Sequence, residues 1–579
     1  MNMPPVTATS LTDPLYYLRN AQQVIRLCLS QYHDLLNAQE NQQLAQLLQL
    51  DTPAQALLMR LVMRKGALFR TDKLSYPEVP DLAQALAQLS ALGFIDLEPL
   101  LHLNELCQVA KREECLQLAR LRLKQTSFAA SSRKGDLVTA LLAHSRNLGE
   151  QSGPLTAATS ADEQKSLIAW WPVAPFSLIQ LTAAPLFDRL RLMFFGNLHQ
   201  DWSEFVLTEL GLQQFEVLPL SVDSRPFQAR EEVDLYLALQ QLSDRAAAGE
   251  AIANIQPLLP QPINCEWLEY RRTKVLYQLG REAERQQAPT LALALYRQSQ
   301  HREAQLRTLR LLEKQCQPAQ VFAHTSTALT IIRQPEALMT VERIRQRSAK
   351  KAGIAYTPPA SLSVPSHSQI LEKPNYHQTP AKPSRGRVEA AVIDHLSDAG
   401  RQLFHVENRL FNGLFALLFW PALFAPIRGA FFNPFQSGPA DLYRPGFIDS
   451  RAQWLAEGFA QLESGEYKAV IVERYRQKQG LSCRFMHWSS VTLALIEQAL
   501  AVIPAAHLKA VFDYLLLDLR HHSKGMPDLI ELDLNQQSYR LLEVKGPGDK
   551  LQDHQRLWIQ TMLRQGLPVS VYQVSWAAS

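Results

Sequence analysis

A short segment near the C-terminus restricts what this chain can form. A Pro-Asp step, Pro527-Asp528, precedes an apolar run that contains Glu543 and Lys545. Residues two apart on a strand point to the same face of a sheet. Glu543 and Lys545 are therefore predicted to share one side of a strand, where Asp528 can reach them from the preceding turn. The alternative interpretation is a solvated strand face, but a charged pair in an apolar strand is costly without a partner ion or substrate.

The residue types in this segment indicate a particular chemistry. Two carboxylates offer hard oxygen ligands, which suit Mg²⁺ or Mn²⁺. A lysine beside them can hold a phosphate oxygen or orient a water molecule. Metal-assisted hydrolysis of a phosphodiester needs this combination. The pattern therefore predicts a divalent-metal site at the edge of a sheet.

The residues around the site predict a compact set of elements. Residues 529–533 and 539–545 are predicted to be two strands of a hairpin, because a polar turn separates them. Glycine and proline residues then end the second strand. A helix over about residues 550–563 is expected to follow, with Gln555 able to face the site. Residues 569–574 are predicted to form a third strand.

At this point the segment resembles a known family. It is similar to the VRR-NUC branch of the PD-(D/E)XK nuclease superfamily. The superfamily fold implies a small mixed sheet flanked by helices, with metal-binding carboxylates at the sheet edge. The resemblance rests on Gly525, Pro527, Asp528, Leu529, the run from Glu543 to Asp549, Leu551, Gln555 and Trp558.

Within that branch, the length and the upstream segments resemble the Fanconi-associated nuclease family in its bacterial form. The supporting residues are Arg387 to Glu389, His405 to Asn408 and Leu414 to Trp420. In this family an upstream helix contributes a further acidic ligand. Glu407 is the preferred match and Glu389 is its rival, whereas His405 is interpreted as an ordinary residue on a helix face.

The resemblance also implies a division of roles. The metal ligands would be Glu407, Asp528, Glu543 and the carbonyl of Val544. The catalytic residues would be Asp528, Glu543, Lys545 and Gln555. Lys545 would stabilise the attacked phosphate and help to position the water, and Gln555 would orient the water or support the ligands. The cofactor would be Mg²⁺ or Mn²⁺.

Length and composition limit the remaining possibilities. A chain of 579 residues is too long for one hydrophobic core. The net charge is only +4, so binding to nucleic acid must depend on local basic patches. None of the six cysteines forms a C-x-x-C pair, so neither a zinc site nor a disulfide framework is indicated.

No membrane association is expected. The N-terminus lacks the basic and apolar regions of a signal peptide. The most apolar segment, residues 414–425, is too short to span a bilayer and is predicted to be a buried core helix. We therefore expect a bacterial protein of the cytoplasm that is associated with the nucleoid when bound to DNA.

The expected fold class is multidomain, with a mostly α N-terminal part followed by an α/β, restriction-endonuclease-like PD-(D/E)XK domain. Many proline residues and nine basic residues interrupt the helical pattern between them, which predicts a flexible basic tether or a plain connector. The predicted divisions are a helical, possibly winged-helix-like domain at 1–102, a SAP-like DNA-binding module at 103–150, a helical connector at 151–235, a TPR-like helical domain at 236–342, a basic proline-rich linker at 343–387, and a VRR-NUC domain with a helical insertion at 388–579.

Several basic residues are candidates for contact with DNA. Arg133 and Lys134 begin the second helix of the SAP-like module, where a helix N-terminus can also bind phosphate. Arg271, Arg272 and Lys274 form a possible phosphate-facing group in the TPR-like part. Lys550 follows the predicted catalytic strand and completes the set. A solvated helix face or a packed core is the alternative interpretation for each group.

The resemblance implies a structure-specific DNA nuclease. It would cut near 5′ flaps and branched junctions, act as a 5′-to-3′ exonuclease, and function in repair of DNA interstrand crosslinks. The insertion between Glu407 and Asp528 would cover the dimerisation surface of simpler relatives, so the active unit is expected to be a monomer on branched or flapped double-stranded DNA. The alternatives are a Holliday-junction resolvase and a catalytically inactive DNA-binding scaffold.

Overall fold

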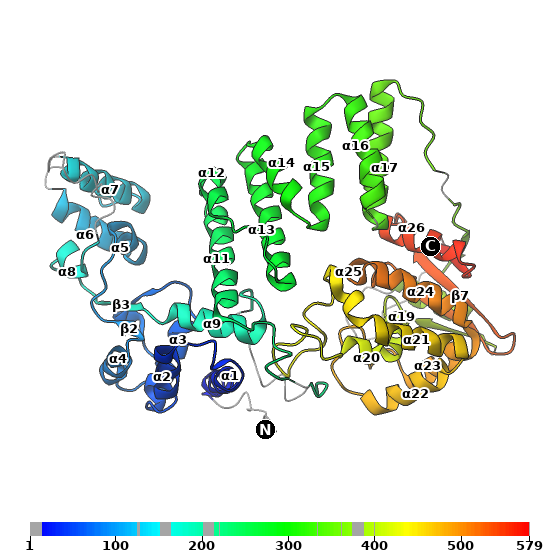
Figure 1. The fold of residues 1–579 in the computed structure, drawn as a ribbon, viewed down its shortest axis with the longest axis horizontal. Coiled ribbons are helices and arrows are strands. Elements are labelled where there is room, and N and C mark those ends of the chain that lie inside the picture. Colours follow the sequence, from blue (N-terminus) through cyan, green and yellow to red (C-terminus); the bar gives the residue numbers. More distant parts are fainter. Residues whose placement is uncertain are drawn as a thin grey trace. The chain divides into compact units, whose positions relative to one another are not determined.

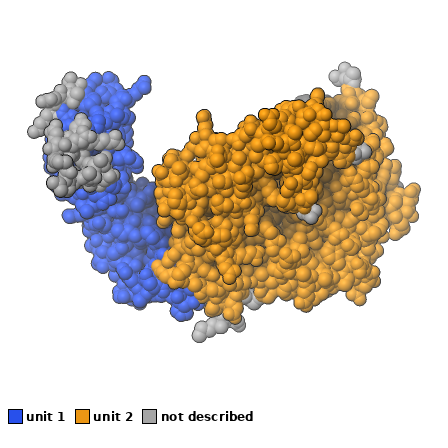
Figure 2. All heavy atoms as spheres, turned by 45° about the horizontal axis from the view of Figure 1, so that its top comes forward, with its two compact units in different colours: residues 1–212 blue, residues 213–579 orange. Residues whose placement is uncertain are grey.

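The structure is a computed structural model of the whole chain. It describes residues 14–123, 128–150, 164–200, 214–218, 220–332, 334–359, 362–372, 387–398 and 400–577. The chain divides into two compact units, residues 1–212 and residues 213–579 (Figure 2). The predicted divisions within each unit are finer than this and remain predictions.

The first unit begins with helices and a small antiparallel sheet. Strand order is β1-β3-β2, so the central strand is the last in sequence. This strand belongs to the segment that was predicted to be a helical connector. Its partners lie more than 80 residues upstream, so no local hairpin pattern marks it. The elements are α1 (Tyr16–Tyr32), α2 (Ala38–Leu47), α3 (Thr52–Val62), β1 (Leu68–Arg70), α4 (Leu82–Ala91), β2 (Ile95–Asp96) and β3 (Leu178–Leu181).

Most of the rest of the first unit is a helical cluster around the buried indole rings of Trp170 and Trp171, whereas α9 packs against α1. The SAP-like prediction falls on α6 and α7, whose connection is described only in part. Lys134 donates to the carbonyls of Gln108 and Ala110 at 3.2 and 2.7 Å, whereas Arg133 is exposed. The helices are α5 (Leu103–Val109), α6 (Arg112–Arg122), α7 (Lys134–Glu150), α8 (Leu167–Trp170) and α9 (Ala184–Phe195).

The second unit starts with a row of helices that pack against their sequence neighbours (Figure 1). Short connections join them, which is the arrangement expected for TPR-like pairs. Gly280 shows how closely they pack, because a Cβ there would lie 2.5 Å from Cε1 of Tyr296. The helices are α11 (Arg230–Ala247), α12 (Ile252–Ile255), α13 (Glu266–Arg285), α14 (Pro289–Gln298), α15 (Arg302–Gln315), α16 (Pro318–Ile331) and α17 (Pro335–Ala352).

The C-terminal part contains a five-stranded mixed sheet of order β4-β8-β7-β6-β5. β6 and β7 form the expected antiparallel hairpin. β7 and β8 are parallel, and helix α26 (Asp553–Arg564) connects them. α26 begins three residues later than predicted, because residues 546–549 form a turn closed by a hydrogen bond from Gly546 N to Asp549 Oδ2. The strands are β4 (Ser366–Leu371), β5 (Arg401–His405), β6 (Leu529–Asp533), β7 (Ser538–Lys545) and β8 (Val569–Trp576).

One large apolar core joins this sheet to the helices around it. α19 belongs to this core and all of its residues are buried, as predicted for residues 414–425, but the helix ends at Leu418 and the short helix α20 follows it. No single described helix is long and apolar enough to cross a bilayer; α23 and α24 pass that test only as a pair bent by 113°. The helices are α18 (Arg387–Leu396), α19 (Leu410–Leu418), α20 (Trp420–Leu423), α21 (Ala452–Ser464), α22 (Tyr467–Lys478), α23 (Leu493–Val502), α24 (Ala505–Leu517) and α25 (Leu519–His522).

The predicted linker, residues 343–387, contains regular structure at two places. Helix α17 continues to Ala352, and β4 adds an edge strand parallel to β8. Five of the six residues of β4 are exposed, so its sequence carries no alternation of apolar and polar residues. Its partner is 205 residues away, and backbone hydrogen bonds together with the buried side chain of Leu371 place it in the sheet. Proline spacing therefore could not reveal it.

Gly280 provides a test of the helical packing. Gly280→Ala should lower the free energy of unfolding by about 1–3 kcal/mol, although alanine favours helices. The reason is that Tyr296 cannot swing away, since it is buried and its hydroxyl donates to Glu284. Gly135→Ala is the control, because Gly135 is helical and has no atom within 4 Å of a Cβ. Chemical denaturation measures both variants, and equal stability changes would contradict the packing.

Candidate metal centre and active site

The strand registers bring three separate segments to one end of the sheet. His405 on β5 lies opposite Leu529 on β6, and Leu529 lies opposite Leu542 on β7. Asp528 precedes Leu529, and Glu543 follows Leu542. The residues that follow His405 therefore meet both carboxylates. This is the convergence that the sequence pattern predicted for Asp528 and Glu543.

Backbone hydrogen bonds hold the Glu407 turn against Asp528. The carbonyl of Asp528 accepts hydrogen bonds from the amides of Val406 and Glu407, at 2.9 and 3.2 Å. Asn408 adopts a left-handed conformation with φ of 53°, and its Oδ1 accepts from the amide of Met526 at 3.0 Å. Two turns far apart in sequence are thereby fixed to each other.

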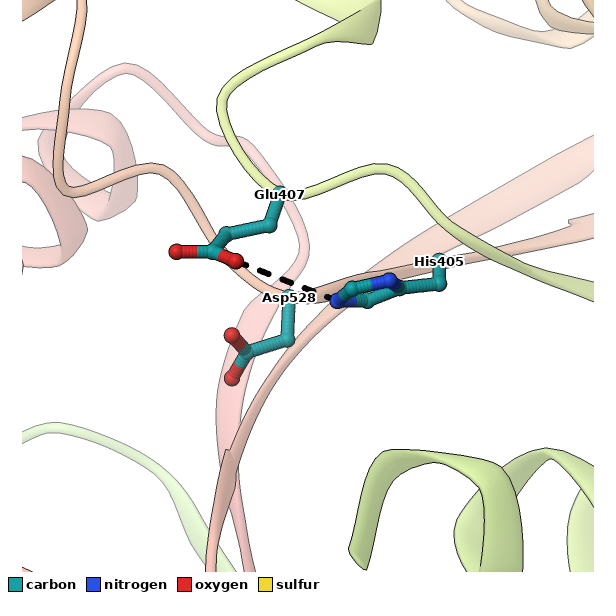
Figure 3. Close-up of side chains that lie close together, drawn as sticks. All are labelled: His405, Glu407 and Asp528. Atoms are coloured by element: carbon teal, nitrogen blue, oxygen red, sulfur yellow. Dashed lines mark ion pairs between the residues drawn. The ribbon is translucent and has the colours of Figure 1, made fainter. Parts of the chain in front are cut away.

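His405, Glu407 and Asp528 form a cluster that could hold a metal ion (Figure 3). One ligand atom from each lies within 4.8 Å of the others, and His405 Nε2 is 3.9 Å from Glu407 Oε2. His405 lies on strand β5, and Glu407 follows it in a turn. The sequence interpretation was wrong in placing both on a helix. Glu389, the rival ligand, does lie on a helix, α18.

Glu543 is fully buried and forms the other half of the site. Its Oε1 accepts from Lys545 Nζ at 2.8 Å and from Gln555 Nε2 at 2.6 Å. Gln555 Oε1 in turn accepts from Lys545 Nζ at 3.2 Å. These contacts bring together three of the residues expected to be catalytic. Oε2 of Glu543 is buried and has no hydrogen-bond partner in the described part of the chain.

Burial changes the acidity of both carboxyl groups. The pKa of Glu543 is raised to about 8 overall, first by burial and then by the charge of Asp528, against the opposing effect of Lys545. The pKa of Asp528 is raised to about 6 overall, chiefly by burial. A hydrogen bond from the Val544 amide lowers it, and the charges of Glu389 and Glu407 raise it. Negative charge is thus concentrated without enough positive charge nearby.

The group of side chains fits a divalent cation. Carboxylate oxygens are hard ligands, and a cation would offset the mutual repulsion of Asp528, Glu543 and Glu407. It would also satisfy the buried Oε2 of Glu543, which the protein leaves without a partner. The arrangement can therefore hold a divalent metal ion next to a lysine ammonium group.

The predicted DNA-binding residues have different surroundings. Arg271 and Arg272 are 5% and 4% exposed, and they bond to Gln240 and Glu269 respectively. Both guanidinium groups thus bond within the protein, although Nε of Arg271 is buried without a hydrogen-bond partner among the described residues, and their phosphate-facing role stays a prediction. Lys550 is exposed in the loop after β7.

A basic cavity of about 320 Å³ lies near these residues and was not predicted. Arg302, Arg444 and Arg520 line it, as does His301. Burial lowers the pKa of Lys274, and the charges of Arg271, Arg520 and Arg444 lower it further. The pKa of His301 is lowered to about 4, first by burial and then by the positive charges of Arg302, Lys274 and Arg520. No spacing in the sequence marks this group, because distant segments supply its members.

Comparisons with known proteins agree with this architecture. The family described as "FAN1, HTH domain" matches residues 15–96, and the family "VRR-NUC domain" matches residues 462–576. The "Fanconi-associated nuclease 1 homolog" of Pseudomonas aeruginosa is 39% identical over 99% of this chain and 98% of its own. Fanconi-associated nuclease 1 of Homo sapiens is 24% identical over 96% of this chain and 62% of its own.

A solved structure is similar over nearly the whole chain. It is described as paFAN1 bound to 2nt 5′ flap DNA with a gap, and its TM-score is 0.77 at 38% identity. The match covers 99% of this chain and 100% of the other. These findings confirm the predicted fold class and the predicted family. This chain belongs to the Fanconi-associated nuclease family, and its C-terminal part is a nuclease domain of the VRR-NUC type.

Proposed function

We propose that this protein is a metal-dependent, structure-specific DNA endonuclease and 5′-to-3′ exonuclease. It cuts near 5′ flaps and branched junctions during repair of interstrand crosslinks, in the bacterial cytoplasm and at the nucleoid. The observation that carries this proposal is the convergence of Glu407, Asp528 and Glu543 beside Lys545. The similarity to a structure that contains 5′ flap DNA supports the choice of substrate.

The metal is Mg²⁺ or Mn²⁺, because carboxylate and carbonyl oxygens suit these ions. Asp528, Glu543 and Glu407 would hold it, and the Val544 carbonyl would add a ligand. The cation neutralises charge on the phosphate and lowers the pKa of the attacking water. An imidazole from His405 would favour Mn²⁺ over Mg²⁺, since nitrogen is a softer ligand than oxygen.

Lys545 and Gln555 complete the site. The Lys545 side chain is 14% exposed, so its ammonium group acts in a partly dry environment where charge stabilisation is strong. It stabilises the negative charge that develops on the attacked phosphate. Gln555 bonds to both Lys545 and Glu543, so it fixes their positions and can also orient the water.

DNA phosphates bind in the basic cavity and at exposed cations. Lys274, Arg444 and Arg520 form no ion pair with a carboxylate of the described residues. Arg444 lies with Cζ 3.1 Å from the ring centre of Trp267, and burial lowers its pKa to about 10. Arg520 is exposed and Lys274 and Arg444 are half-buried. Asp518, the carboxylate that lines the cavity, is already paired with Arg302 at 2.6 Å. The remaining cations favour an anion. Arg133 and Lys550, which are exposed, supply further contacts to the duplex, whereas the ammonium group of Lys134 is bonded to the carbonyls of Gln108 and Ala110.

The active unit is a monomer. Helices α21 to α24 lie in the insertion between Glu407 and Asp528, and they pack into the large core beside the sheet. This insertion occupies a position that a small nuclease would need for a symmetric partner. A single active site then cuts one strand at a time, as flap removal requires.

The carboxylates provide the direct test. Asp528→Asn and Glu543→Gln should each lower the rate of cleavage of a labelled 5′ flap by at least about 100–1,000-fold, because each removes a charge that holds the metal. Asp513→Asn is the control, since Asp513 lies on the exposed side of α24. Binding to the flap, measured by fluorescence anisotropy, should remain within about threefold. Normal cleavage by either variant would refute the site.

The raised pKa values of Glu543 and Asp528 predict how stability depends on pH. The folded pKa values of Glu543 and Asp528, about 8 and about 6, exceed the values of 4.5 and 3.8 for unperturbed groups. The folded state therefore binds protons more tightly than the unfolded state. Without metal, the melting temperature should fall as the pH rises from about 5 to 8.

Two comparisons isolate this effect. Glu543→Gln should show a smaller decline over the same pH range, because its amide does not ionise. Millimolar Mn²⁺ should raise the melting temperature of the wild type most at pH 8, where the carboxylates bind it without releasing protons. If the melting temperatures of the wild type and Glu543→Gln depend on pH in the same way, ionisation of Glu543 does not destabilise the metal-free folded state.

The basic cavity is tested by Arg520→Gln. The affinity for flap DNA should fall by about tenfold, and the slope of log K against log salt should decrease by about one, because one phosphate contact is lost. Arg476→Gln is the control, since Arg476 is 57% exposed on α22 and lines neither described cavity. An unchanged slope in Arg520→Gln would exclude this cavity from the DNA path.

A further inference from the structure

A second cavity lies directly beside the metal carboxylates. Its volume is about 580 Å³, within the range of about 300–1,000 Å³ for pockets that enclose one small molecule. The volume suits a nucleotide rather than a duplex. Its lining includes Glu407, Gln555, Tyr443, Arg484, Lys524 and His554.

Tyr443 also lines the basic cavity, so one side chain forms part of the wall of both. Two guanidinium groups lie against its ring. The Cζ atom of Arg520 is 4.7 Å from the ring centre, and that of Arg484 is 5.7 Å from it. The Tyr443 hydroxyl makes no hydrogen bond with the described residues. The ring is therefore accessible from two cavities and is accompanied by positive charge.

The chain around Tyr443 is held rigidly. Arg451 is completely buried, and its two terminal nitrogens bond to Asp441 at 2.7 and 3.0 Å. Its Nε donates to the carbonyl of Ala422 at 2.8 Å. Leu442 and Phe447 are both 2% exposed and anchor the segment in the core. An aromatic ring on a fixed segment loses little entropy when a ligand stacks on it.

The rim of the basic cavity is apolar. Ile331, Ile448 and Leu517 line it and remain 54%, 37% and 58% exposed. Exposed apolar side chains gathered at a cavity indicate a binding surface. A paired strand presents phosphates and hides its bases, whereas an unpaired strand can place bases and sugars on such a rim. The surroundings therefore favour unpaired nucleotides.

We propose that Tyr443 is a stacking platform for an unpaired nucleotide of the strand that is cut, held between the metal carboxylates and the basic cavity. Stacking of a base on an aromatic ring tolerates any sequence, and neighbouring arginines neutralise the adjacent phosphates. Tyr443 is thus a specificity-determining residue, because a base that remains paired cannot reach the ring. This inference rests on the proposed nuclease function.

The test combines a protein change with a DNA change. Tyr443→Leu should lower kcat/KM on a 5′ flap by about 5- to 150-fold, the equivalent of about 1–3 kcal/mol, whereas Tyr443→Phe should stay within about threefold. In the wild type, an abasic nucleotide should cause a similar loss at one position next to the cut. The same abasic site should cost Tyr443→Leu little, because the stacking partner is already absent.

Tyr356→Leu is the matched control. Tyr356 is also half-buried with an arginine over its ring, Arg345 at 5.0 Å, but it lines neither cavity. A second readout is independent of cleavage. With a chelator present, 2-aminopurine at the same DNA position should be quenched on binding to the wild type and to Tyr443→Phe, but not to Tyr443→Leu.

The outcomes separate this inference from the proposed function. If the wild type cuts flaps but Tyr443→Leu behaves like Tyr356→Leu, or if the abasic loss is equal in both, the stacking role is refuted. If the wild type cuts no DNA, the proposed function fails, and the 2-aminopurine signal still decides for or against stacking. If Tyr443→Leu does not fold, the abasic series in the wild type decides: a loss at one position supports stacking, and uniform cleavage refutes it.

Discussion

The repulsion between buried carboxylates governs the active end of this molecule. Asp528 and Glu543 are brought together by strand pairing, and burial raises the pKa of both. Among the described residues, the ammonium group of Lys545 is the cation that offsets these negative charges. It therefore maintains a site that is unfavourable without a cation and becomes favourable with one. A folded scaffold that keeps such charges together creates affinity for metal and for the phosphate that the metal helps to bind.

Other residues of the second unit are placed with respect to these carboxylates. The carbonyl of Asp528 fixes the backbone of the Glu407 turn, so the residue that carries a third carboxylate stays beside the other two. Positive charge is placed at a distance, in the basic cavity, where Arg444 and Arg520 have no carboxylate partner among the described residues. If those cations lay among the carboxylates, they would neutralise them and displace the metal. The carboxylates suit a metal ion, the basic cavity suits phosphates, and Tyr443, on the wall of both cavities, suits a base. One DNA strand carries phosphates and bases that could occupy these places.

Local patterns were sufficient where neighbours in sequence are also neighbours in space. The β6–β7 hairpin, the shared face of Glu543 and Lys545, and the core helix around Leu414 were all predicted from short segments. Patterns failed where the partner is distant. β3 and β4 pair with strands far away in sequence, His405 proved to lie on a strand, and Arg271 and Arg272 proved to be buried. The arginines of the basic cavity follow no spacing at all.

The amino-acid sequence by itself determined the chemistry of this protein: two carboxylates and a lysine at strand spacing, which suit a divalent cation and a phosphodiester. It did so because the period of a strand is fixed by the backbone, whatever the rest of the chain does. Only the tertiary structure decided which further residues join them. Register brings His405 and Glu407 to Asp528 across more than 100 residues, and packing places Tyr443 on the wall of the adjacent cavity; such long-range contacts leave no periodic trace in a single sequence.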